Sequence, residues 1–175
     1  MEKIELQEII DACEKSGSEY INLYRPLLGY EDDITLYRGA DDSVMDALTE
    51  VETKIGLEFP ADFFQVYLLS NGGKYFDIKL FSLTSDKKYV DGIYYQNLVA
   101  DTRKEYNVPD NMLLIGESTD GVLVLIGLDE DDCYYYSLWN KETKEEEMQF
   151  DYLPELLMYE IDYYTGTFDV DEEEE

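Results

Sequence analysis

Apolar residues recur with the period of a helix at several places in the first half of the chain. They predict an amphipathic helix over residues 4–16, a less regular helical piece over 18–28, and a third helix that Ser43 caps and Gly56 ends. A short run that follows Pro60 is apolar nearly all round and stops at Asn71. We therefore expect a short helix there, placed in the core and marked at both ends.

Beyond residue 73 the pattern changes to that of strands. The expected strands lie at 75–82, 112–115, 122–128, 133–138 and 146–150, and the expected helices at 94–106 and 153–163. The strand at 122–128 is apolar on both faces, which is typical of a central strand that is covered on both sides. Together these patterns predict an α+β fold with an antiparallel-rich sheet.

Charge restricts the kind of partner that this chain can bind. The 175 residues include 13 Lys and Arg against 42 Asp and Glu, which gives a formal net charge of −29 at pH 7. A nucleic-acid backbone and an anionic membrane surface both require a basic face, so neither is expected as a partner. Leu, Ile, Val and Phe make up more than a quarter of the residues, above the roughly 20% below which a highly charged chain stays disordered. We therefore expect one globular domain.

Several kinds of chemistry are excluded because the chain has no histidine. Ser-His-Asp and Cys-His catalytic groups and HExxH zinc sites all require it. The two cysteines, Cys13 and Cys133, form no CxxC pair, so neither a zinc site nor a cofactor is expected. The N-terminal residues contain no apolar signal core, and no apolar run approaches the roughly 18 residues of a membrane span. We expect a cytoplasmic protein with two reduced cysteines.

Two loops have the spacing of ligand sites but lack the residues that such sites need. The turn at 129–132 is acidic like a calcium loop, yet Tyr134 and Asn140 occupy the positions of the required glycine and bidentate acid. Residues 116–121 have the spacing of a phosphate loop, but Val122 replaces the lysine. No metal site is expected, and 116–121 is interpreted as a hairpin connection. A hydrolase that uses two of the many carboxylates stays open as a third alternative.

One ordered pattern between residues 44 and 73 resembles the signature of the SUKH superfamily, the Smi/Knr-like group. That signature is a helix with a glutamate, a segment similar to LGxxLPxDY, an apolar helix and a final NGG. The same order is present here as Glu52, the segment 56–63, an apolar run and the sequence 71–73. Phenylalanine replaces the usual leucine at position 59 and the usual tyrosine at position 63.

Later segments are similar to the same family. The glycines of 116–121 precede an apolar strand, the run 134–137 resembles the aromatic strand of the family, and 150–157 resembles the start of its closing helix. The resemblance implies a single mixed sheet flanked by helices, with fold markers at Glu52, Gly56, Pro60, Asp62, Asn71, Gly72, Gly73, Gly116 and Gly121. We accordingly divide the chain into an N-terminal helical extension (1–35) that packs on the domain, a SUKH-like domain (36–165) and an acidic C-terminal tail (166–175).

The resemblance implies a protein that binds other proteins, and the family offers no established catalytic residues. Bacterial members are immunity proteins that neutralise polymorphic toxins, often nucleases, whereas fungal relatives regulate cell-wall synthesis. We therefore expect no enzyme but a protein with a basic protein partner. In the first interpretation the partner is a toxin domain, and in the second it belongs to an endogenous process. The sequence leaves the oligomeric state open.

The candidate binding residues combine acidic charge with tyrosine. The chain has 17 tyrosines, and tyrosine is enriched at interfaces because it offers a large, stiff contact area with a polar tip. Tyr135 is opposite in phase to its tyrosine neighbours on the expected strand and follows the acidic turn, which suits a basic partner. The expected partner-binding residues are Tyr135, Asp129, Glu130, Asp131 and Asp132.

Overall fold

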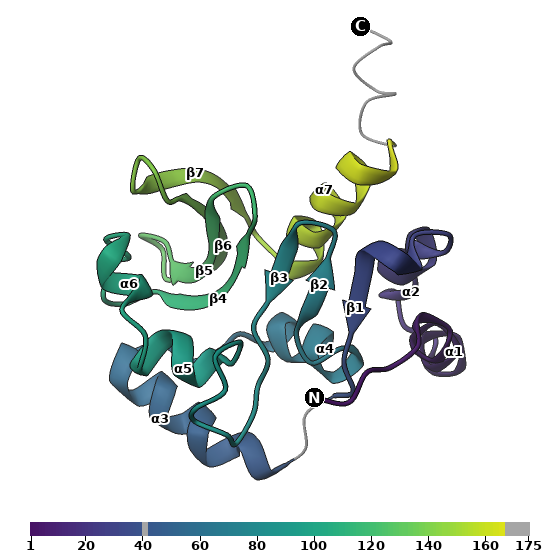
Figure 1. Ribbon diagram of the computed structural model, residues 1–175, viewed down its shortest axis with the longest axis horizontal. Helices are drawn as coiled ribbons and strands as arrows, with labels where there is room; N and C mark the ends of the chain where they lie inside the picture. Colours follow the sequence, from purple (N-terminus) through teal and green to yellow (C-terminus); the bar gives the residue numbers. More distant parts are fainter. Residues whose placement is uncertain (40–41, 167–175) are drawn as a thin grey trace, which may run out of the picture.

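Within residues 1–39 and 42–166, which the computed structural model describes, seven strands form one sheet. Their order in the sheet follows their order along the chain, and each strand is antiparallel to its neighbours (Figure 1). The strands are β1 (Ile34–Leu36), β2 (Gly73–Tyr75), β3 (Ile78–Leu80), β4 (Leu113–Ser118), β5 (Val122–Leu128), β6 (Tyr134–Asn140) and β7 (Glu145–Phe150). A parallel bridge between Ser82 and Gly92 lies outside these strands. The expected α+β fold with a single sheet is confirmed.

Helices flank this sheet (Figure 1). They are α1 (Leu6–Ser16), α2 (Ile21–Tyr24), α3 (Met45–Ile55), α4 (Ala61–Leu69), α5 (Ile93–Leu98), α6 (Thr102–Glu105) and α7 (Leu153–Thr165). Single 3-10 turns occur at Arg25–Leu27, Glu31–Asp33 and Asp42–Val44. Helices α4 and α7 pack against each other, α3 packs on α5, and α1 and α2 lie beside the β1 edge of the sheet.

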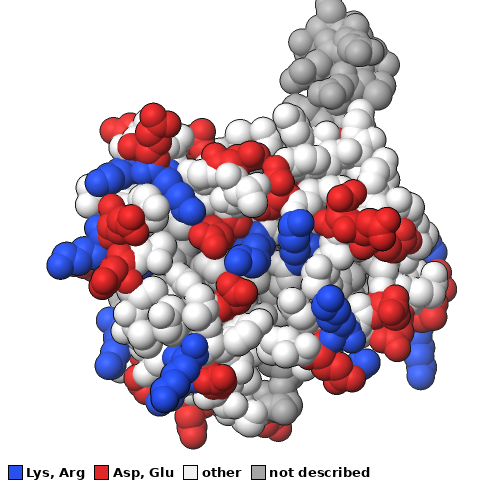
Figure 2. Space-filling model, viewed as in Figure 1, with Lys and Arg blue, Asp and Glu red and all other residues white. Residues whose placement is uncertain are grey.

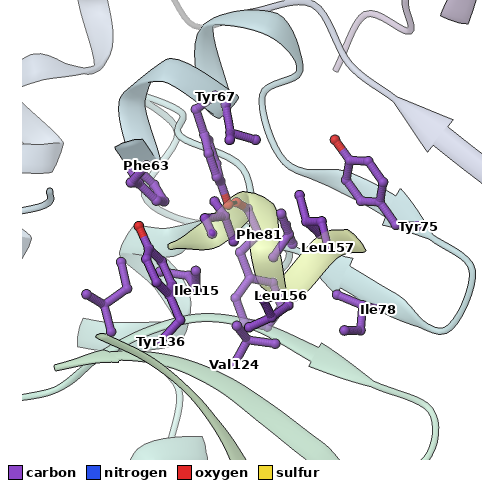
Figure 3. Close-up of a cluster of buried hydrophobic side chains, with 14 of the residues drawn as sticks. Phe63, Tyr67, Tyr75, Ile78, Phe81, Ile115, Val124, Tyr136, Leu156 and Leu157 are labelled. Atoms are coloured by element: carbon purple, nitrogen blue, oxygen red, sulfur yellow. Dashed lines mark hydrogen bonds between the residues drawn. The ribbon is translucent and has the colours of Figure 1, made fainter. Parts of the chain in front are cut away.

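The core lies between α4, α7 and the strands that they cover (Figure 3). The rings of Phe63 and Tyr67 stack with their centroids 4.0 Å apart, and the Tyr67 hydroxyl donates a hydrogen bond of 2.6 Å to the carbonyl of Phe81. Residues 123–126 of β5 are fully buried. Because successive side chains of a strand point to opposite faces, both faces of β5 are covered, as its sequence predicts.

Three of the expected features differ in detail, and one strand was not expected. The segment 75–82 forms no single strand, because Phe76 takes a positive φ of 58° and turns the chain between β2 and β3. The expected helix 94–106 is divided into α5 and α6. Helix α3 begins at Met45 with Val44 at its N-cap position, so the predicted capping role of Ser43 is wrong. Strand β1 is an element that the sequence pattern did not predict.

The segment 1–35 shares the core of the rest of the chain. Ile9, Ile10 and Cys13 of α1 and Leu23 of α2 are buried in the same cluster as the sheet residues. The boundary between residues 35 and 36 falls inside β1, whose three residues pair with β2. Both cysteines are free thiols, Cys13 buried and Cys133 exposed. Of the predicted acidic tail, residues 167–175 lie outside the described part of the chain.

Candidate interaction surface

The acidic turn between β5 and β6 is a compact loop held by its first residue. Oδ1 of Asp129 accepts hydrogen bonds from the backbone N–H groups of Asp131 (2.8 Å) and Cys133 (3.0 Å), and the N–H of Asp129 donates to the carbonyl of Cys133 (2.9 Å). Asp132 has a positive φ of 58°. Asp129 therefore shapes the turn, whereas the side chains of Glu130, Asp131 and Asp132 are exposed.

Tyr135 lies on the opposite face of β6 from the neighbouring tyrosines. Tyr134 donates a hydrogen bond of 2.8 Å to the carbonyl of Glu58, and Tyr136 is fully buried towards α4. Tyr135 stands opposite Gly127 of β5, and a methyl group on that glycine would lie only 3.3 Å from the tyrosine ring. Gly127 thus leaves room for the half-buried ring.

Two carboxylates affect the Tyr135 hydroxyl through their charge. Burial first, and then the negative charges of Glu146 and Asp129, raise the pKa of Tyr135. Asp129 belongs to the turn and Glu146 to β7, so acidic residues of two elements make the potential at the Tyr135 hydroxyl more negative. The five residues that the sequence predicts as partner-binding lie on one hairpin, β5–β6, and their part in binding stays a prediction. Glu146 stands opposite Trp139 in the sheet and affects Tyr135 through its charge.

The markers Glu52 and Asp62 accept hydrogen bonds from distant backbone. Oε2 of Glu52 accepts from the N–H of Phe59 (2.8 Å) and fixes the loop that leads to α4. Oδ2 of Asp62 accepts from the N–H of Leu153 (2.9 Å), the first residue of α7. Pro60, which is buried, is the N-cap residue of α4. These three residues position helices.

Asn71 and the glycine markers are also structural. The side chain of Asn71 donates to the carbonyl of Leu83 and accepts from its N–H, both at 2.8 Å, as a neighbouring strand would. At Gly73 a methyl group would lie 2.3 Å from the carbonyl oxygen of Thr35, so β1 and β2 can pair only if this position is glycine. The remaining glycine markers have a positive φ or stand against another strand; they are Gly56, Gly72, Gly116 and Gly121.

A cluster of carboxylates lies where α7 passes the turn after β2. The hydroxyl of Tyr164 donates a hydrogen bond to Oδ2 of Asp77, and a hydrogen bond with Asp77 raises the pKa of Asp120. Burial, followed by the charges of Asp77 and Asp120, raises the pKa of Glu160 to about 7. The hollow beside them has a volume of only about 190 Å³, and Tyr163 and Tyr164 line it. Sequence reasoning missed this cluster, since its members are far apart along the chain.

Acidic and basic side chains are interspersed on the face seen in Figure 2, where Lys and Arg form no continuous basic area. Several cations are held in ion pairs: Lys79 with Asp91 and Glu117, and Arg38 with Glu2 and Glu8. Arg103 instead donates to backbone carbonyl groups, among them that of Pro109 at 3.1 Å. With 13 Lys and Arg for 42 Asp and Glu, the chain has too few cations for each acid to have its own.

Neither a metal centre nor a membrane helix is found in the described part of the chain. Across residues 1–39 and 42–166, no three Asp, Glu or Cys side chains are arranged to hold a metal ion. No helix in these ranges is long and apolar enough to cross a membrane.

A family model matches most of the fold described above. It is that of the SMI1 / KNR4 family (SUKH-1), and the match covers residues 45–157. The chain belongs to this family. The match begins with α3 and ends within α7, so in this SUKH-1 protein α1, α2 and β1 lie outside the matched region. A comparison with curated proteins found no match.

Family membership accounts for the markers and leaves the binding surface unassigned. The markers of this SUKH-1 protein cap helices, fix loops or allow strands to approach, as their hydrogen bonds show. The acidic turn and Tyr135 lie on the β5–β6 hairpin, apart from those contacts. One hydrogen bond, from Tyr134 to the carbonyl of Glu58, links the hairpin to the loop before α4. Members of this family are generally binding proteins that catalyse no reaction.

Proposed function

We propose that this protein is a cytoplasmic immunity protein that binds a cognate toxin domain with a basic active face, such as a nuclease, and neutralises it by covering that face. Membership of the SUKH-1 family supports a role in protein binding. The net charge of −29 supports a basic partner. Covering the face requires no catalytic group in the immunity protein.

The observation that carries the proposal is the acidic β5–β6 turn beside Tyr135. Glu130, Asp131 and Asp132 are exposed and take part in no ion pair within the described ranges. A half-buried aromatic ring and unpaired carboxylates on the same hairpin offer a basic partner both a contact area and charge complementarity. Complementary fields raise association rates to about 10⁸ to 10⁹ M⁻¹s⁻¹ at low salt.

The proposal is tested by mixing the protein with toxin domains encoded next to its gene and measuring binding by calorimetry and stopped-flow fluorescence. We expect a stoichiometric complex that abolishes the toxic activity. The association rate should fall steeply as salt rises from about 50 to 500 mM, because the Debye length shortens. A complex with a salt-independent rate would exclude the acidic mechanism but not immunity.

A charge-matched pair of variants locates the surface. Glu130→Gln, Asp131→Asn and Asp132→Asn together should slow association about tenfold at low salt. Asp129 is left unchanged because it shapes the turn. The control carries Asp11→Asn, Glu105→Gln and Glu142→Gln, which remove the same charge from exposed residues that also form no ion pair among the described residues. Equal effects of both variants would show that only total charge matters.

The alternative function, regulation of an endogenous process such as cell-wall synthesis, follows from the other branch of the same family. It predicts an isolated gene and a partner other than a toxin. If no toxin domain of the same genome binds at micromolar concentration, the immunity proposal is wrong.

A further inference from the structure

A groove with a volume of about 670 Å³ lies between three helical segments. The residues that line it belong to three segments: 19–23, which includes most of α2; the start of α4; and 152–158 at the start of α7. These segments come from the two ends and the middle of the chain, so the sequence pattern gave no sign of the groove. Its volume lies in the range of about 300–1,000 Å³ that is typical of binding sites.

Each of the three segments contributes one carboxylate to the groove: Glu19, Asp62 and Glu155. No Lys or Arg lines it, and none of the three acids forms an ion pair among the described residues. After burial, the charges of Asp62 and Glu19 raise the pKa of Tyr20, which agrees with a negative potential in the groove. The groove therefore attracts a cation, and none of the described residues supplies one.

Apolar side chains lie between these acids. Tyr152 is 55% exposed at the start of α7, and Met158 and Leu23 line the groove as well. Two hydrogen bonds fix the shape: the Tyr20 hydroxyl donates to Oε1 of Gln65 at 2.6 Å, and the Leu153 N–H donates to Asp62. The site is thus formed before any partner arrives, which lowers the entropic cost of binding.

We propose that this groove is the docking site for a segment of the toxin partner that presents Arg or Lys between apolar side chains. The alkyl stem of such a side chain packs on Tyr152 and Met158, and its charged head lies among the carboxylates. This proposal rests on the proposed function and adds the groove to the surface that would contact the toxin. Tyr134 bonds to Glu58, three residues before α4, so the acidic β5–β6 turn and the groove are near the same helix start. One partner can cover both.

Other occupants fit the groove less well. A second copy of the chain would bring another net charge of −29 against an acidic site. The C-terminal segment 169–175 consists of six acids and one valine, so it is repelled as well. A basic segment is the occupant that the charges of the groove favour.

The test is a titration of the ¹⁵N-labelled full chain with three acetylated pentapeptides, followed by nuclear magnetic resonance. The first alternates leucine and arginine, the second leucine and glutamate, and the third serine and arginine. We expect the first peptide to shift the signals of Glu19, Gln65, Tyr152 and Glu155, and the other two to bind at least about tenfold more weakly. Equal binding of the serine–arginine peptide would overturn the apolar part of the proposal, and shifts outside the groove would overturn the site.

Matched variants complete the experiment. Glu19→Gln with Glu155→Gln should weaken the leucine–arginine peptide about fivefold to tenfold, and Tyr152→Ala about tenfold. Asp62 is left unchanged because it caps α7. The control, Glu105→Gln with Glu142→Gln, removes the same charge from exposed residues that do not line the groove, and it should have no effect. An equal loss in the control would show that the groove is not the site.

The same variants separate this proposal from the proposed function. If the peptide binds in the groove but no toxin domain binds, the groove proposal holds for a basic partner of another kind and the immunity proposal fails. If a toxin domain binds with the same affinity to the protein and to both groove variants, immunity holds and the groove proposal is overturned.

Discussion

Oδ2 of Asp62, in the first turn of α4, accepts a hydrogen bond of 2.9 Å from the backbone N–H of Leu153, 91 residues later, where α7 begins. The side chain does for α7 what an N-cap residue does within its own helix, because the first N–H groups of a helix have no partner inside it. A marker of the family thus joins the starts of the two helices that cover the core.

Replacing Asp62 by alanine should lower the free energy of unfolding by about 1–2 kcal/mol, the usual cost of losing a cap. Asp62→Asn keeps an oxygen acceptor and should lose less than half of that. Urea unfolding followed by circular dichroism measures both. Equal losses in the two variants would show that the charge of Asp62, and not its hydrogen bond, stabilises the fold.

Two asparagine side chains bond to backbone groups in the way that a neighbouring strand would. Asn71 bonds both the N–H and the carbonyl of Leu83, and Asn97 does the same with Leu114 at 2.9 and 2.8 Å. Truncation of either asparagine to alanine leaves a buried donor and a buried acceptor without partners. We expect each to lower the free energy of unfolding by about 2–4 kcal/mol. Asn111→Ala, at an exposed position, is the control and should change it by less than about 0.5 kcal/mol.

Asn71 was a marker in the sequence and Asn97 was not, although their contacts are alike. This contrast indicates what could be predicted. Patterns that are local, such as the glycine after α3, the proline before α4 and the apolar run of β5, predicted elements close to those observed. Contacts that depend on a partner far along the chain were missed.

Strand β1 illustrates the second case. Its three residues alternate as apolar, polar and apolar, but a run of three is too short to predict a strand, and it joins the sheet by pairing with β2. The candidate surfaces divide in the same way. The acidic turn with Tyr135 is local and was predicted, whereas the groove needs α2, α4 and α7 to meet and was not.

The raised pKa of Glu160 predicts a pH-dependent stability. Its pKa is about 7 in the folded protein against an ordinary value of 4.5, so between these values the folded state binds more protons than the unfolded state. The contribution of Glu160 to the free energy of unfolding is therefore fully present below about pH 4.5, and it is lost as the pH rises to about 7.

The substitution Glu160→Gln should remove this loss of stability at higher pH. At pH 8 the variant should be more stable than the natural protein by about 1–2 kcal/mol, a value reduced from the full shift because the side chain is partly exposed to solvent. At pH 4.5 the two should be equal. Thermal unfolding between pH 4.5 and 8 measures the difference, and Glu145→Gln on β7 should show no trend. A constant difference at every pH would contradict the assignment to Glu160.

The last prediction concerns β7, which pairs with β6 on one side and ends the sheet on the other. An edge strand exposes N–H and carbonyl groups that can pair with a second chain, and charged side chains on the edge oppose such pairing. Here the strand begins with three exposed glutamates, Glu145, Glu146 and Glu147.

Glu145→Val with Glu147→Val removes two of these charges and raises the β-propensity of the edge, so we expect the variant to associate through β7. Light scattering after size-exclusion chromatography should give it a larger molar mass than the natural protein at the same concentration. The control, Asp46→Val with Glu105→Val, makes the same chemical change on helices and should leave the mass unchanged. If both variants associate equally, the glutamates of β7 act only through the total charge of the protein. An effect on strand pairing would appear only in the variant that changes β7.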